Sequence, residues 1–140
     1  MPHQSKPKNS KEAMQIGQKD LAEKFDITFS DVKDGFACGE LPLGSLHRNF
    51  YGVPYGGIMY HLADNTAGMA FLSLGGNGVT VNGSVNYLRG AKPEAKKLIC
   101  RANVKKSGRK LFFVSADVYD DSENLLSEYM FVFTNLTTGE

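Results

Sequence analysis

The residues best suited to do chemistry lie between Asn49 and Ala70, where a glycine-rich turn leads directly into an apolar helix. Gly56 and Gly57 stand where the first N–H groups of that helix should be free and point outward. Such a helix start attracts negative charge. It would therefore stabilise an oxygen that gains charge during attack on a carbonyl or thioester.

Asp64 is the second candidate, since it follows Gly57 by about two helical turns. Apolar neighbours such as Leu62 and Ala63 indicate a partly buried carboxylate, which could serve as base or nucleophile. The alternative is an ordinary helix start, begun by Pro54 and the two glycines, with Asp64 facing water. On these residues alone the ordinary helix start is favoured.

Length and composition narrow the class of protein. The chain has 140 residues, 41% of them hydrophobic and 22% charged, which predicts one globular domain. A net charge of +1 gives no reason to expect a nucleic-acid partner. Cys38 and Cys100 stand far apart without a histidine cluster, so we expect free thiols and no metal site. No segment reads as a signal peptide or membrane span, so we expect no membrane partner and a cytoplasmic location.

The first part of the chain predicts a flexible tail over residues 1–8 and a single domain over residues 9–140. Asn9 and Glu12 have the spacing of a capping box, followed by a short N-terminal helix. Two strands follow, at 25–32 and 36–41, with a turn at Gly35 and a loop over 43–53. The long helix should run from Tyr55 to Leu74.

The rest of the chain predicts strands at 79–88, 98–106, 110–120 and 125–136, joined by short turns. One long helix and about six strands predict an α+β fold, in which an antiparallel sheet wraps around the helix. Neither a GxSxG elbow, nor GxGxxG, nor a P-loop occurs, so nucleotide cofactors and serine-hydrolase chemistry are not expected.

Three motifs in order carry a family resemblance: Asn49-x-x-Gly52-x-x-x-Gly56-Gly57, then Leu62-Ala63-Asp64, then the run 85–91, VNYLRGA. They resemble the hotdog-fold acyl-CoA thioesterases of the PaaI type, over roughly residues 25 to 136. The resemblance implies hydrolysis of a small or aromatic acyl-CoA. Coenzyme A would enter as part of the substrate, with no separate cofactor.

The resemblance also implies site roles. Asp64 would be the general base or nucleophile, the Gly56 N–H would hold the thioester oxygen, and Asn49 would help to polarise the carbonyl. Thr80 would orient the attacking water. In such enzymes the aspartate and the oxyanion groups come from opposite subunits, which implies at least a homodimer, and a homotetramer where dimers pair again.

One residue departs from the family pattern. Tyr55 stands where the family has a histidine, and tyrosine does not titrate near neutral pH. A hotdog protein that binds acyl-CoA without hydrolysis is therefore the main alternative, and a dehydratase is a second. His61 could approach Asp64, although a packing or surface role is favoured for it, and His47 is expected on the loop surface.

Basic and small residues resemble the places where hotdog thioesterases meet the phosphates of coenzyme A. These substrate-binding candidates are Gly57, Arg89, Ser107, Gly108 and Arg109. A solvated hairpin that needs charge for solubility is the alternative for the lysine-rich turn around Gly108.

Overall fold

The structure is a computed structural model, which describes Glu12 and residues 25–136. The expected tail over residues 1–8 and nearly all of the expected N-terminal helix lie outside these described residues.

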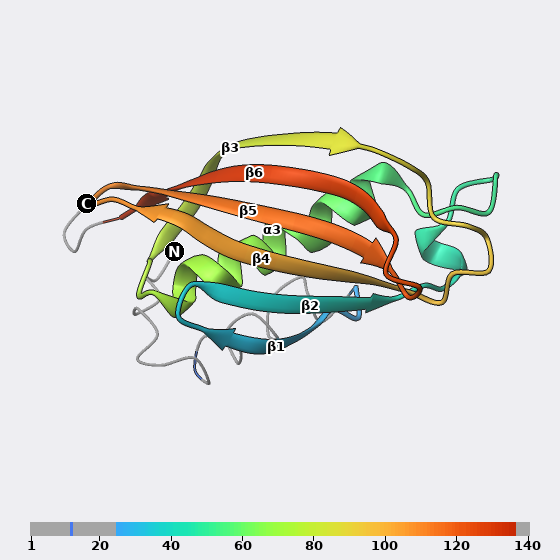
Figure 1. Cartoon of the computed structure of the whole chain (residues 1–140), viewed down its shortest axis with the longest axis horizontal. Coiled ribbons are helices and arrows are strands. Elements are labelled where there is room, and N and C mark those ends of the chain that lie inside the picture. The colour runs from blue at the N-terminus through green and yellow to red at the C-terminus, as the bar shows by residue number, and fades with distance from the viewer. Residues whose placement is uncertain (1–11, 13–24, 137–140) are drawn as a thin grey trace.

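A six-stranded sheet forms the body of the described chain (Figure 1). The strands run in the spatial order β1-β2-β4-β5-β6-β3, and every neighbouring pair is antiparallel. Their bounds are β1 Thr28–Lys33, β2 Phe36–Pro42, β3 Gly78–Tyr87, β4 Lys97–Ser107, β5 Leu111–Asp120 and β6 Leu125–Asn135. All six expected strands are present, with ends shifted by at most three residues.

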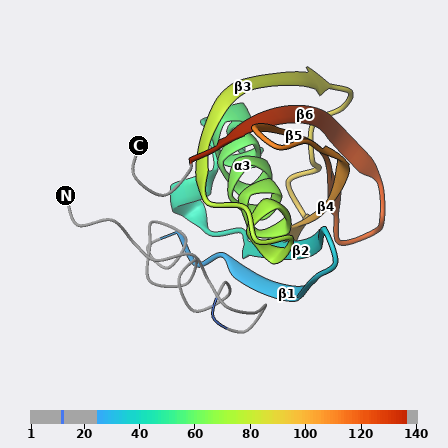
Figure 2. The same cartoon turned by 90° about the vertical axis from the view of Figure 1, so that its left-hand side faces the viewer.

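Helix α3 (Gly56–Ser73) lies inside the curved sheet, as Figure 2 shows along the helix. Its sequence is apolar around most of its circumference, and a helix of that kind must be covered on several sides. The side chains of Leu62, Ala63 and Ala67 are fully buried. The fold predicted from the sequence, an antiparallel sheet wrapped on one central helix, is confirmed. No helix in the described part of the chain is long and apolar enough to cross a membrane.

The two residues expected at the helix ends act as caps. Tyr55 is the N-cap, with extended backbone, and Leu74 is the C-cap. Beyond Leu74, the Gly75 N–H donates to the Leu72 carbonyl at 2.8 Å. Gly75 has a φ of +83°, a conformation that glycine adopts without strain.

Aromatic side chains fill the space between helix and sheet. Phe71 stacks on Phe133, with ring centroids 4.9 Å apart, and meets the edge of Phe112. Phe131 is fully buried, and Tyr129 is nearly so. These aromatic residues belong to the hydrophobic core.

The helix approaches strand β2 most closely at Gly39. A Cβ atom on Gly39 would collide with the Thr66 hydroxyl and lie 3.3 Å from Leu62 Cδ1. Thr66 is itself fully buried, and its hydroxyl donates to the Leu62 carbonyl at 2.7 Å. Only glycine at position 39 allows this separation between helix and sheet.

Strand β3 forms one edge of the sheet, and most of its side chains are exposed. Val79 is 55% exposed and Val81 54% exposed. Its sequence, GVTVNGSVNY, contains no charged residue and no proline. Natural edge strands usually carry such residues to prevent pairing with other chains, so β3 is an unprotected edge.

We expect Gly39→Ala to lower the free energy of unfolding by about 1–3 kcal/mol, because an added methyl group overpacks the contact with Thr66. Thr66→Ala removes the obstructing hydroxyl, so the double variant should lose less stability than the two single losses added together. Denaturant unfolding of the four proteins measures this coupling. Gly90→Ala is the matched control, since a Cβ there has no neighbour within 4 Å. Purely additive losses would contradict the proposed contact.

Candidate active site

Asp64 lies on the α3 face directed at strand β3. The Thr80 hydroxyl donates a hydrogen bond to Asp64 Oδ1 at 2.8 Å. Asp64 is half-buried and Thr80 is exposed, so the carboxylate is held in place and still open to a ligand. The family resemblance gives Thr80 the role of orienting the attacking water opposite the aspartate. In the structure its hydroxyl bonds to the aspartate itself, and both side chains belong to one chain.

A β-bulge at Val81 makes that contact reachable. The register of β3 against β6 shifts between Thr80 and Asn82. Tyr87, Val85 and Gly83 alternate toward the helix, and strict alternation would then direct Thr80 to the opposite face. The extra residue turns Thr80 back toward the helix, which is a known use of bulges near sites.

The start of α3 offers two unpaired donors. The Tyr55 carbonyl accepts the N–H groups of Ile58 and Met59, at 3.1 and 3.2 Å. The N–H groups of Gly56 and Gly57 have no hydrogen-bond acceptor within the described part of the chain. A Cβ on Gly57 would have no neighbour within 4 Å. Gly57 is exposed and Gly56 is partly exposed, and free N–H groups at such a helix start are suited to bind an anion.

Asn49 braces the loop before the helix through its side-chain oxygen. Asn49 Oδ1 accepts the N–H of Tyr51 at 3.0 Å and that of Val53 at 3.3 Å. Two N–H donors require the oxygen at this position, which fixes the orientation of the amide. The Nδ2 group then has no acceptor among the described residues and can donate to a ligand.

Tyr55 and His47 meet through the backbone. The Tyr55 N–H donates to the His47 carbonyl at 3.0 Å, and the Tyr55 side chain is 49% exposed. The Tyr55 hydroxyl makes no hydrogen bond to any described residue.

The expectation of a surface position for His47 is wrong. Its side chain is 4% exposed, because the 3-10 helix η1 (Ser45–His47) turns it inward, where Nδ1 accepts the Gly44 N–H.

His61 does not pair with Asp64. Its ring packs against Phe25, with centroids 4.5 Å apart, and its backbone carbonyl accepts the Asn65 side-chain amide. The contact with Phe25 agrees with the packing or surface role favoured for His61.

The candidate residues fall into two groups at different places along the chain. Asn49, Gly56, Gly57 and Arg89 lie where α3 begins and β3 ends. Asp64 follows Gly56 by eight residues, about 12 Å along the helix axis. A carbonyl oxygen held by the Gly56 N–H at about 3 Å is therefore out of reach of Asp64 in the same chain. The candidate residues of one chain therefore form two separate groups.

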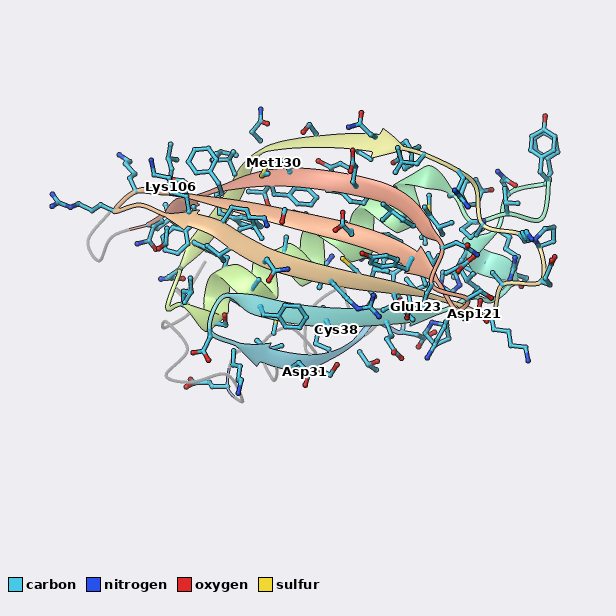
Figure 3. The ribbon with its side chains drawn as sticks, viewed as in Figure 1. Asp31, Cys38, Lys106, Asp121, Glu123 and Met130 are labelled. Atoms are coloured by element: carbon cyan, nitrogen blue, oxygen red, sulfur yellow. The ribbon has the colours of Figure 1, made fainter. Side chains whose placement is uncertain are left out.

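The β4–β5 hairpin, which carries Ser107, Gly108 and Arg109, lies far from the helix start. Figure 3 labels Lys106 at the left end of the molecule, whereas β3 ends and α3 begins at the right in Figure 1. Asn135, paired with the first residue of β3, bonds to the Lys110 carbonyl, which places the hairpin at the Thr80 end of β3. Arg89 and Arg109, both exposed, are thus not brought together within one chain.

Tyr87 contacts the start of α3. The sequence did not predict this contact, because Tyr87 stands out there only as part of the run 85–91. Its hydroxyl donates to the Gly56 carbonyl at 2.8 Å.

The sequence matches the model of a known family and one curated relative. Residues 51–127 match the family model of the thioesterase superfamily. A putative esterase of Archaeoglobus fulgidus is 28% identical over 107 residues, which is 76% of this chain and 69% of that protein.

Solved structures share the fold. A conserved protein of Pseudomonas aeruginosa has 29% identity, a TM-score of 0.77, and coverage of 84% of this chain and 94% of that one. A hypothetical thioesterase of Streptococcus pneumoniae has 23% identity, a TM-score of 0.81, and coverage of 88% and 96%. The PaaI protein of E. coli has 18% identity, a TM-score of 0.80, and coverage of 90% and 95%.

The chain belongs to the thioesterase superfamily. Its hotdog fold, six antiparallel strands around one main helix in the described residues, is that of the PaaI type. The protein is a thioester hydrolase.

We expect Asn49→Asp and Asn49→Ala to affect the loop differently. Aspartate keeps both acceptor bonds to Tyr51 and Val53, whereas alanine removes them. Amide hydrogen exchange at these two residues should therefore be unchanged in Asn49→Asp and faster by about tenfold in Asn49→Ala. Equal exchange in both variants would contradict the bracing role of Oδ1.

Proposed function

We propose that this protein hydrolyses the thioester of a small or aromatic acyl-CoA. The Gly56 N–H, with Asn49 Nδ2, polarises the thioester carbonyl of one substrate molecule. Asp64 of a second copy acts as general base on water or as nucleophile, and Thr80 of that copy holds the carboxylate. The N–H groups act as an oxyanion hole for the negative charge that develops in the transition state.

The observation that carries this proposal is that one chain contains two different groups of candidate residues, which we call half-sites. One has unpaired N–H donors at an accessible helix start, and the other has a carboxylate oriented by the Thr80 hydroxyl at 2.8 Å. An acyl transfer to water needs both functions at one carbonyl. The separation of about 12 Å between Gly56 and Asp64 along the helix supports a site in which a second copy supplies one of them.

The edge strand β3 supplies a geometry for that second copy. Gly83 lies between Thr80 and Tyr87 on β3, and Tyr60 lies midway between Gly56 and Asp64 on α3. A Cβ on Gly83 would collide with the Tyr60 hydroxyl, so these two midpoints face each other. Antiparallel pairing of two β3 strands about a two-fold axis near Gly83 would bring the Gly56 end of each copy toward the Asp64 end of the other.

The same pairing would bring the two basic regions together. In the dimer, Arg89 of one copy approaches the hairpin of the other, with Ser107, Gly108 and Arg109. Guanidinium groups suit phosphate oxygens by charge and by geometry. We therefore assign these residues to the coenzyme A part of the substrate. Association of dimers into a homotetramer rests on the family resemblance alone.

Two structural neighbours from streptococci support a coenzyme A ester as substrate. The Streptococcus pneumoniae protein was solved with coenzyme A, and a Streptococcus mutans protein with acetyl-CoA. Solved variants of the former replace an aspartate and a threonine 16 residues apart with alanine. Asp64 and Thr80 have the same separation. The E. coli PaaI protein comes from a phenylacetic acid degradation operon, which supports small or aromatic acyl groups.

A second candidate function is binding of acyl-CoA without efficient hydrolysis. It is favoured by Tyr55, which stands where the family has a histidine and whose exposed side chain has no hydrogen bond to any described residue. The chain retains both the Asp64 carboxylate and the helix-start N–H donors, so hydrolysis is the better-supported function. The dehydratase alternative has weaker support, because neither His47 nor His61 bonds to Asp64 in this structure.

We expect Asp64→Asn to reduce kcat for hydrolysis of short-chain or aromatic acyl-CoA by about 10²- to 10⁴-fold, since it removes the base. Release of free thiol, followed with a chromogenic disulfide, measures the rate. Asp31→Asn is the control: Asp31 lies on β1, and asparagine also tolerates its φ of +53°. Coenzyme A esters that bind but are not cleaved by the wild type would favour the binding function instead.

Mixed dimers test the sharing of the site between two copies. Asp64→Asn and Asn49→Asp chains, each nearly inactive alone, should regain about a quarter of wild-type activity when mixed in equal amounts, because half the dimers are mixed and each holds one intact site. Co-purification through two different affinity tags isolates the mixed species. If Asp64 and Asn49 of the same chain formed the site, mixing would restore no activity.

A further inference from the structure

The first peptide of helix α3, between Gly56 and Gly57, is contacted from strand β3. The Tyr87 hydroxyl donates to the Gly56 carbonyl at 2.8 Å. A Cβ on Gly56 would lie 3.2 Å from both Cζ and Oη of Tyr87, closer than side chains normally approach. Glycine at 56 and tyrosine at 87 therefore fit as a pair.

The hydrogen bond acts on the peptide group that ends in the Gly57 N–H. That N–H has no acceptor among the described residues, and the space above it is open. A donor on the carbonyl oxygen of a peptide group polarises the N–H of the same group and strengthens its own bond to an acceptor. It also fixes the plane of the peptide, and so the direction of the N–H.

Other aromatic residues hold the Tyr87 ring. Tyr87 meets Tyr129 edge to face, with centroids 6.5 Å apart, and the Tyr129 hydroxyl bonds to Ser127 Oγ at 2.7 Å. Tyr129 and Ser127 are both buried. Burial, with a smaller contribution from Tyr60, raises the pKa of Tyr87, so the phenol keeps the proton that it donates.

We propose that Tyr87 is a positioning residue for the oxyanion donors. Its hydroxyl orients and polarises the Gly56–Gly57 peptide, so that the Gly57 N–H joins the Gly56 N–H in binding the thioester oxygen. This inference rests on the proposed hydrolysis of an acyl-CoA and adds Gly57 as a second donor. Strand β3 then positions both half-sites, with Thr80 near its start and Tyr87 at its end.

Tyr87→Phe tests the inference, because it keeps the ring against Tyr129 and removes only the hydroxyl. We expect kcat to fall about tenfold with KM for the acyl-CoA changed less than twofold. Tyr119→Phe is the matched control. Tyr119 lies under the Arg101 guanidinium, 4.8 Å from its ring centroid, on β5. The Tyr119→Phe variant should keep the wild-type kcat and KM.

A nuclear magnetic resonance readout separates positioning from general destabilisation. Gly-Gly pairs occur twice in the chain, at 56–57 and 75–76. Labelling glycine with ¹³C at the carbonyl and with ¹⁵N therefore yields two carbonyl-to-amide correlations. In Tyr87→Phe the Gly56 carbonyl and Gly57 amide resonances should move upfield. The Gly76 correlation, an internal control, should stay in place.

The inference would be overturned if Tyr87→Phe left kcat unchanged or left the Gly56–Gly57 correlation in place. A rise in KM with no fall in kcat would also overturn it. If the wild type cleaves no thioester, the proposed function fails, and so does the catalytic role of Tyr87. The glycine spectrum then still reports whether the hydroxyl polarises this peptide.

Discussion

The structure depends on the burial of a helix that is apolar around most of its circumference. Helix α3 cannot lie on one flat face of a sheet without leaving apolar surface in water. The sheet therefore curves around it, and close contacts such as that of Gly39 with Thr66 set the separation. The polar groups of α3 that we propose for catalysis lie in its first turn and on the side toward β3, where Asp64 meets Thr80.

Strand β3 contacts α3 at both of these places, the first turn and Asp64. It touches the helix start through Tyr87 and the aspartate through Thr80. A regular strand could not direct both residues inward, because Thr80 and Tyr87 differ by an odd number of positions. The bulge at Val81 corrects the alternation. One irregularity in an exposed strand thus lets a single element contact both the Asp64 carboxylate and the proposed oxyanion donors.

The main parts of this arrangement could be predicted from local patterns in the sequence. Glycines before an apolar run define where α3 begins, and the spacing of Asp64 places it two turns later. Other parts depend on tertiary contacts. Burial of His47 follows from the turn η1 and its bond to Gly44, which composition does not reveal. The bulge at Val81 and the contact of Tyr87 with Gly56 need the register of β3 against β6, which no short motif determines.

The uncharged edge of β3 also has a consequence for the rate law. If each site combines groups from two copies joined along this strand, an isolated chain has no complete site. Specific activity then depends on the fraction of chains in dimers, and at high dilution the rate rises with the square of protein concentration. Newly made chains would then remain inactive until they meet a partner. In a dimer of that kind, the lack of charge on one strand would link the onset of activity to the abundance of the protein.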